Sequence, residues 1–248
     1  MYKTLIIIPT YNEKDNIDVI YKAISKLYPN FHVLFIDDKS LDGTLNKLNF
    51  LKKNNKNIFI IKRKKKLGIG SAHKKGILWG YKNKYNYIIT MDADGTHDPI
   101  YISKMLKIAQ FIPIVSTTRY VFKNSFSEWH IIRRLLTRFR HFLVGRLLKF
   151  KDLDSSGAFR VYNSKLVKLS DILLAKNDSY SFFFESLFIF KMKKYKIIQI
   201  PIYMKTRKYG DSKINLTEII SALYYLIKIF LNNILKKNIL NYLNKKLI

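Results

Sequence analysis

Short apolar runs alternate with helical segments along the first half of the chain, and this alternation is what constrains the fold most. The runs are rich in Ile, Val, Leu and Phe, and segments of about ten or more residues with helical patterning separate them. Strands that are apolar over nearly their whole length are typical of a parallel sheet with helices on both faces. The expected strands are residues 3–8, 31–36, 57–62, 85–91 and 112–117, and the expected helices are 16–27, 42–54, 71–83 and 100–110.

The second half continues with elements of both kinds and shows no change in composition typical of a linker. Its expected elements are a long basic helix over 128–148, a short strand over 158–162, a largely helical segment over 178–194 and a strand over 197–204. The last strand contains Pro201, which cannot donate a ladder hydrogen bond and therefore favours an edge or a bulge. We expect one domain over residues 1–213 and a C-terminal appendage over 214–248.

Residues 216–235 combine a wide apolar face with one polar stripe. The stripe members recur at spacings of three and four: Glu218, Ser221, Tyr225, Lys228 and Asn232. A helix packed on the domain would have this pattern, but lysine pairs beyond residue 235 also suit a helix in a membrane interface. Because Glu218 and Lys228 interrupt the stretch, it falls short of the ~20 apolar residues of a spanning helix. We expect an amphipathic helix that lies in a membrane interface or binds a partner.

Two carboxylates, Asp92 and Asp94, follow the expected strand over residues 85–91. In an extended backbone this spacing points both side chains to the same side, and the carboxyl edge of an open parallel sheet is where such folds bind ligands. Oxygen ligands suit Mg²⁺ or Mn²⁺, which keep positions open for phosphate oxygens. The motif alone is weak, because acidic residues also cap helices, as we expect of Asp98 before Pro99.

The net charge of +29, from 46 basic and 17 acidic residues, favours an anionic partner. Nucleic acid, nucleotide phosphates and an anionic membrane surface all fit this charge. The absence of cysteine excludes disulfides and thiolate metal sites. The N-terminal sequence has no signal-peptide pattern, so a cytosolic setting is expected. A nucleic-acid-binding protein remains a distant alternative, because no helix-turn-helix, zinc or RNA-recognition pattern is present.

Polar segments follow the other expected strands as well, at the edge where an open α/β sheet binds ligands. In chain order they are residues 9–13, 37–44, 66–72, 92–94 and 118–120. In this order and spacing the chain resembles the inverting nucleotide-sugar glycosyltransferases of the GT-A fold. The fold this implies is α/β and Rossmann-like, a mostly parallel sheet with helices on both faces, followed by a C-terminal amphipathic helix.

The second half narrows the resemblance to the polyprenol-phosphate (dolichol-phosphate) mannosyltransferases, through residues 129–134, 154–162, 180–185 and 200–213. It implies metal-assisted transfer of a hexose, mannose from GDP-mannose, onto a polyprenyl phosphate with inversion. It also implies a peripheral protein on the cytoplasmic face of a membrane, with a separate small membrane protein as a further anchor. Departures at 121–126, Ala158 and Phe183 leave open UDP-glucose or another nucleotide sugar, or a saccharide acceptor.

The resemblance assigns roles residue by residue. Around the nucleoside it implies Pro9, Tyr11, Glu13, Asp37 and Asp38. It implies Mg²⁺ or Mn²⁺ at Asp92 and Asp94, and around the diphosphate and the acceptor phosphate it implies Arg119, Arg133, Arg207 and Lys213. Glu185 joins them as a site residue through the 180–185 motif, and Lys66 through its place beside the Leu67-Gly68 loop.

The implied nucleophile is a phosphate monoester, whose second pKa near ~6 leaves it mostly dianionic at neutral pH. It needs positioning more than deprotonation, so no strong general base is required. His97 is the nearest base along the sequence, and we expect a histidine in this turn to lie on the surface. We also expect the cationic run over residues 62–66 to be a solvated loop, with Lys66 as its functional member.

Overall fold

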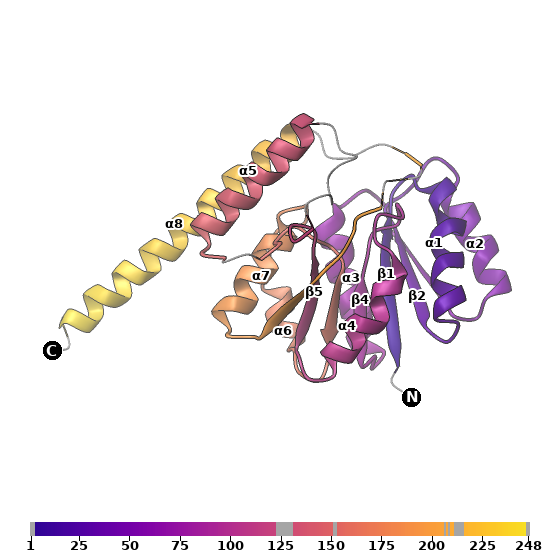
Figure 1. Cartoon of the computed structure of the whole chain (residues 1–248), viewed down its shortest axis with the longest axis horizontal. Coiled ribbons are helices and arrows are strands. Elements are labelled where there is room, and N and C mark those ends of the chain that lie inside the picture. Colours follow the sequence, from indigo (N-terminus) through magenta and orange to yellow (C-terminus); the bar gives the residue numbers. More distant parts are fainter. Residues whose placement is uncertain are drawn as a thin grey trace.

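A computed structural model describes residues 3–122, 131–150, 153–205, 207, 209–210 and 216–246, without the side chains of 132, 133, 216 and 236–246. Its centre is a seven-stranded sheet of order β3-β2-β1-β4-β6-β5-β7 (Figure 1). The strands are β1 (Thr4–Thr10), β2 (His32–Asp37), β3 (Ile58–Lys62), β4 (Tyr87–Thr90), β5 (Ile114–Thr118), β6 (Arg160–Asn163) and β7 (Ile197–Pro201).

The sheet is mixed but mostly parallel, as the sequence predicts. The pairs β1–β2, β1–β4, β2–β3 and β5–β7 are parallel. Strand β6 runs antiparallel to both of its neighbours, β4 and β5. Pro201 ends β7, which lies at the edge of the sheet, so the expected edge position is confirmed.

Helices cover both faces, because successive residues of the central strands point to opposite sides. Leu5 and Ile7 of β1 pack on one side, and Ile6 and Ile8 pack on the other. The first face is covered by α3 (Ile69–Lys82), α5 (Ile131–Leu147), α6 (Leu169–Leu173), α7 (Phe182–Met192) and α8 (Leu216–Lys246). The second face is covered by α1 (Lys14–Leu27), α2 (Thr44–Asn54) and α4 (Ile102–Ala109).

Most element boundaries fall within a few residues of the expected ones, and the differences are local. Pro9 does not stop β1 but pairs with Ile36 inside it. The short helix α6 had no expected counterpart, because a single turn carries too little periodicity to be read. A short 3₁₀ turn (Pro99–Tyr101) precedes α4, and the Asp98 carboxylate accepts a hydrogen bond from Ile100 N at 3.1 Å, which confirms the predicted cap.

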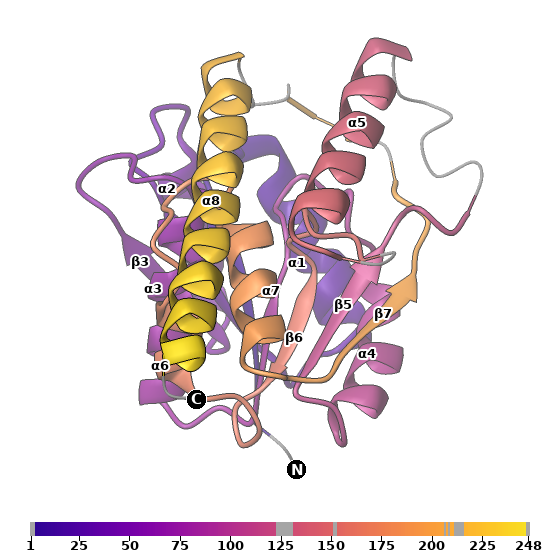
Figure 2. The ribbon, with the colours of Figure 1, turned by 90° about the vertical axis from the view of Figure 1, so that its left-hand side faces the viewer.

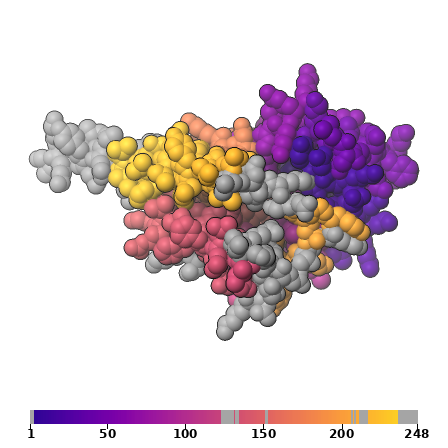
Figure 3. Space-filling view, turned by 90° about the horizontal axis from the view of Figure 1, so that it is seen from above, coloured from indigo at the N-terminus to yellow at the C-terminus, as the bar shows by residue number. Residues whose placement is uncertain are grey.

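Helices α5 and α8 lie side by side and extend beyond the sheet (Figures 1 and 3). Figure 2 shows them in front of the rest of the chain, with α7 behind them. Leu226 is buried, but most of the large apolar side chains of α8 are exposed, as are Phe139 and Phe142 of α5. Residues Thr217–Leu235 are long and apolar enough to cross a membrane, and 6% of this stretch is buried within the protein. The described part of α8 is therefore not a core helix.

Candidate active site

The carboxyl ends of the parallel strands meet at one edge of the sheet, and the segments that follow them carry the predicted site residues. Residues 11–13 follow β1, 38–42 follow β2, 63–68 follow β3, 91–98 follow β4, and 119–120 follow β5. Strand β6 begins at this same edge because it runs in the opposite direction. The segment before it, 153–159, therefore joins the same site.

The Asp92 and Asp94 carboxylates lie close enough that each affects the ionisation of the other. Asp94 is buried, and its Oδ1 accepts hydrogen bonds from Thr96 N at 3.1 Å and from Thr96 Oγ1 at 2.7 Å. Its Oδ2 accepts from Arg207 Nε at 3.0 Å and Nη2 at 2.6 Å. Burial raises the pKa of Asp94, but the Thr96 hydrogen bonds and the Arg207 charge outweigh it and lower that pKa overall. Asp94 is thus held ionised.

Asp92 differs, because no described residue donates a hydrogen bond to its carboxylate, and its side chain is 31% exposed. Burial first, and then the Asp94 charge, raise the pKa of Asp92 to about 7. Its backbone N–H donates to Nδ1 of His97 at 3.1 Å. With this pKa Asp92 is only partly ionised at pH 7, and a cation bound beside it would stabilise its charged form.

His97 is buried, at 4% exposure, so the expectation of a surface histidine is wrong. Its ring stacks on Phe159 with centroids 5.1 Å apart, and this apolar contact explains the burial. Burial lowers its pKa to about 4, so the ring is neutral at pH 7 and accepts the Asp92 N–H through Nδ1. His97 therefore positions the carboxylate segment. The Asp-Gly-Thr-His sequence marks a turn, but it contains no signal for this long-range ring contact.

The carboxylate pair fits a divalent metal with few protein ligands. No group of three or more His, Cys, Asp or Glu side chains capable of holding a metal occurs in the described parts of the chain. Two carboxylates leave most of an octahedral shell to water and phosphate oxygens, which is how Mg²⁺ is usually bound beside a nucleotide. The Asp92 carboxylate, which accepts no hydrogen bond from a described residue, is the observation that favours such an ion here.

At the ends of β1 and β3, the structure brings Tyr11 and Lys66 together. The Lys66 Nζ lies 4.2 Å from the centroid of the Tyr11 ring. Glu13 is half-buried, accepts a hydrogen bond from Asn16 Nδ2 at 2.7 Å, and contributes to the electrostatic environment of Asp92. Pro9 is half-buried near the end of β1. The predicted residues of 9–13 and Lys66 thus lie at the carboxyl edge of the sheet, beside Asp92 and Asp94.

Asp37 and Asp38 are both buried and organise the surrounding loops. Asp37 accepts hydrogen bonds from Ser40 N at 3.0 Å and Ser40 Oγ at 2.6 Å, which fix the turn after β2. Asp38 pairs with Arg63, and it also accepts a hydrogen bond from Leu67 N at 3.2 Å. Arg63 is nearly buried, so the expectation of a fully solvated 62–66 run is wrong at this residue. The ion pair holds the loop that carries Lys66.

Three glycines nearby serve backbone geometry. Gly43 and Gly68 have φ angles of +91° and +92°, a region that L side chains rarely adopt. A Cβ on Gly70 would lie 2.6 Å from the Cβ of Phe182, so α3 needs glycine there to approach α7. These glycines therefore serve turns and a close contact between helices.

Arg119 forms a second cluster with Asp154. Its Nε donates to Asp154 Oδ2 at 2.8 Å, and its Nη2 donates to Asp154 Oδ1 at 3.3 Å and to Ser156 Oγ at 2.5 Å. Burial would raise the pKa of Asp154, but Arg119 outweighs it and lowers that pKa to about 2. The neighbouring Tyr120 ring stacks on His141 of α5, with centroids 3.8 Å apart. Sequence analysis did not single out Asp154 as the partner of Arg119.

The structure places Glu185 in a supporting position. Its carboxylate accepts hydrogen bonds from Lys176 N at 3.0 Å, Asn177 N at 2.9 Å and Tyr225 Oη at 2.7 Å. It therefore holds the loop before α7 and fixes α8 to that helix. Lys213 and the side chain of Arg133 lie outside the residues that the structure describes.

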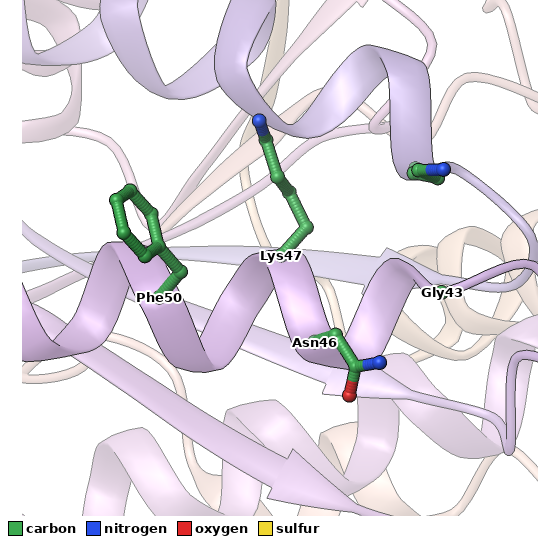
Figure 4. A pocket seen from close by; sticks show the side chains of 5 residues that line it. Gly43, Asn46, Lys47 and Phe50 are labelled. Carbon is green, nitrogen blue, oxygen red and sulfur yellow. The ribbon is translucent and has the colours of Figure 1, made fainter.

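Tyr180, from the motif that contains Glu185, lies nearer to the carboxylates. Burial first, and then the charge of Asp92, raise its pKa to about 12. A shallow surface hollow lies elsewhere, between α1 and α2, lined by Lys14, Gly43, Asn46, Lys47 and Phe50 (Figure 4). None of the predicted site residues lines this hollow, so the strand edge remains the candidate site.

Comparisons with known proteins place this geometry in a family. Residues 5–169 match the profile described as glycosyl transferase family 2. The chain is 27% identical over 224 residues to a polyprenol monophosphomannose synthase of Mycolicibacterium smegmatis, covering 90% of this chain and 84% of that protein. It is 25% identical over 213 residues to an undecaprenyl-phosphate mannosyltransferase of Micrococcus luteus, covering 86% and 88% respectively.

Solved structures show the same fold at lower identity. The chain aligns with glucosyl-3-phosphoglycerate synthase of Mycobacterium tuberculosis in complex with Mn²⁺, UDP and glucosyl-3-phosphoglycerate, with a TM-score of 0.60 and 15% identity. The alignment covers 91% of this chain and 80% of that one. The same synthase in complex with UDP alone gives a TM-score of 0.64 at 13% identity, over 92% and 80% of the two chains. The GT-A-like fold expected from the sequence is confirmed. Because the profile match spans more than half of the sequence and most of the sheet, the chain belongs to glycosyl transferase family 2.

Proposed function

We propose that the chain transfers mannose from GDP-mannose to a polyprenyl phosphate, with inversion at the anomeric carbon. The observation that carries this proposal is the pair Asp92 and Asp94 at the carboxyl edge of the sheet, with Asp92 lacking a cation. The polyprenol-phosphate substrates named for the relatives from M. smegmatis and M. luteus support the acceptor class.

Residues around the carboxylates suit a nucleoside diphosphate donor. We assign the base to the side of Tyr11 and Lys66, where a ring and a cation face each other. Mg²⁺ or Mn²⁺ held by Asp92 and Asp94 would stabilise the negative charge that develops on the leaving diphosphate. Arg207 lies beside Asp94 and is the described cation nearest to that pair. Lys213 stays a predicted partner of the same diphosphate.

The acceptor needs no general base, because its phosphate is already mostly dianionic at pH 7. His97 is neutral, buried and engaged with the Asp92 backbone, so it does not offer one. The work left to the protein is to position the acceptor phosphate against the anomeric carbon. We assign the positioning of the acceptor phosphate to Arg119 and Arg133.

Helices α5 and α8 suit a membrane surface where such a lipid acceptor resides. Exposed apolar side chains occur on both helices, including Phe139, Phe142, Leu223 and Leu231, and α5 also carries exposed arginines such as Arg146. Apolar and basic residues together favour an interfacial helix on an anionic leaflet. We propose peripheral binding at the cytoplasmic face, with a small membrane protein as a further anchor, rather than a span by Thr217–Leu235.

A donor screen tests the proposal. Purified protein, Mn²⁺ or Mg²⁺ and a short polyprenyl phosphate are incubated in parallel with radiolabelled GDP-mannose, UDP-glucose and UDP-GlcNAc, and label extracted into organic solvent is counted. We expect metal-dependent lipid labelling from GDP-mannose, and none from the Asp94→Asn variant. Lipid labelling from UDP-glucose instead would identify UDP-glucose, and not GDP-mannose, as the donor. Labelled saccharide without labelled lipid would refute the lipid acceptor.

A further inference from the structure

Helix α5 presents one of its faces to the Arg119 cluster. The Tyr120 ring stacks on His141, and the Tyr120 hydroxyl donates to the backbone oxygen of Thr137 at 3.5 Å. Residues three and four apart share a helix face, so Arg140 lies on the face of Thr137 and beside His141. Arg140 is half-buried, whereas Arg138 on the other side of the helix is exposed. The fold thus directs Arg140 towards the strand edge.

Arg140 faces the Arg119 cluster, in which the Asp154 carboxylate is already paired with Arg119. Asp154 is the carboxylate there, and it accepts both an Nε and an Nη2 hydrogen bond from Arg119. Among the described residues, no carboxylate lies within ion-pair distance of Arg140, and none accepts a hydrogen bond from it. The groups that act on its ionisation are Arg119, Tyr120 and Asp154. Asp154 therefore pairs with Arg119 and leaves Arg140 without a carboxylate partner among the described residues.

Arg160 shows how a structural arginine of this chain is bound, and its environment differs from that of Arg140. Arg160 is 1% exposed and also lacks a carboxylate partner in the described chain. Its three nitrogens donate to Gly157 O at 2.9 Å, Ser186 Oγ at 2.8 Å and Phe183 O at 2.8 Å. A buried guanidinium normally has its donors occupied in this way. Arg140 makes no such set of bonds with the described residues.

We propose that Arg140 binds the acceptor phosphate, together with Arg119, and so determines the affinity for a phosphate monoester. This inference rests on the proposed function, and it assigns a specific residue to acceptor binding. Asp154 neutralises Arg119, so Arg119 alone offers a dianion little net charge. Arg140 supplies the missing charge, and its planar fork can bind two phosphate oxygens at once, which a lysine cannot do.

Steady-state kinetics in detergent micelles test this role, because micelles without anionic lipid remove the contribution of membrane docking. Acceptor concentration is varied at saturating donor for the wild type, Arg140→Gln and Arg140→Lys, with Arg138→Gln as the matched exposed control. We expect Arg140→Gln to raise the acceptor KM by about 10–100-fold, the range of a lost hydrogen bond to a charged group. The donor KM should stay constant, and Arg140→Lys should recover only part of the loss. Arg138→Gln should change the acceptor KM less than twofold.

A binding measurement separates this inference from the proposed function. Calorimetric titration with a short isoprenyl phosphate needs no turnover, and we expect binding to the wild type that Arg140→Gln weakens and Arg138→Gln preserves. If the wild type binds this ligand but transfers no sugar to it, the proposed function fails while the anion site stands. Equal acceptor KM values for Arg140→Gln and Arg138→Gln would overturn the inference. The inference would also be overturned if Arg140→Gln weakened only the binding to phosphatidylglycerol vesicles, because Arg140 would then bind lipid headgroups.

Discussion

Replacing Asp154 by Asn tests how far the Arg119 cluster depends on a buried charge. The Asp154 side chain is 2% exposed, and its pKa falls from an ordinary 3.8 to about 2. At 1.36 kcal/mol per unit, this difference corresponds to about 2 kcal/mol of stability at neutral pH. The amide also leaves the Arg119 guanidinium without a counter-ion, and breaking a buried pair in this way costs about 3–5 kcal/mol. We expect Asp154→Asn to lose about 2–4 kcal/mol of unfolding free energy at pH 7.

The loss should depend on pH with a definite sign. Because the pKa of Asp154 is lower in the folded than in the unfolded chain, its stabilisation is complete above about pH 5. It is lost progressively as the pH falls from about 5 through the folded pKa near 2, and only below that pH is the carboxyl protonated in both states. Urea unfolding followed by circular dichroism at pH 7, 5 and 3 measures the difference between wild type and variant. That difference should be constant from pH 7 to 5 and smaller at pH 3.

An exposed ion pair provides the matched control. Asp18 and Lys47 are 2.5 Å apart, but their side chains are 34% and 36% exposed. Exposed pairs contribute about 0–1 kcal/mol, so Asp18→Asn should have little effect at any pH. If Asp154→Asn is as stable as Asp18→Asn, or if its loss is the same at pH 3 and pH 7, the buried charge does not stabilise the fold and the reasoning is refuted.

Three further changes probe other parts of the molecule. His97→Phe keeps an aromatic ring but leaves the Asp92 N–H without its acceptor, so Mn²⁺ affinity, measured by titration, should fall about 10-fold or more; an unchanged affinity would deny His97 its positioning role. Gly70→Ala places a Cβ 2.6 Å from a side-chain atom of α7 and should lower the melting temperature, whereas Gly157→Ala, whose nearest neighbour is 3.6 Å away, should not. Deleting residues 216–248 should release the protein from anionic liposomes, and an insoluble product would instead make α8 part of the core.

The fold and the position of the Asp92 and Asp94 carboxylates at the strand edge could be predicted because their signals are local. The strand before Asp92-Ala-Asp94 is apolar along its length. A few residues are therefore enough to predict both its burial and its polar end. Several such strands in one parallel sheet must end at the same edge, so the predicted residues from 9–13, 66–72 and 118–120 come together without any knowledge of side-chain contacts. The domain boundary at residue 213 stays a prediction.

The partners of the predicted cations could not be predicted, because they are distant in sequence. Arg63 meets Asp38 across 25 residues, Arg119 meets Asp154 across 35, and Arg207 meets Asp94 across 113. Nothing in a run of lysines and arginines says which member is turned inwards. His97 was misplaced for the same reason, since its burial depends on Phe159, which the strand order brings close.

These pairings also explain why a net charge of +29 does not by itself locate the site. At the strand edge, arginines and carboxylates largely cancel: Asp38 takes Arg63, Asp94 takes Arg207 and Asp154 takes Arg119. Beside these pairs, the Asp92 carboxylate accepts no hydrogen bond from a described residue, and the Arg140 guanidinium forms no ion pair with one. They have opposite signs, and the proposed reaction needs both a metal cation beside the donor diphosphate and a phosphate anion as acceptor. The groups that remain without a partner of opposite charge, rather than the total charge, therefore indicate the function.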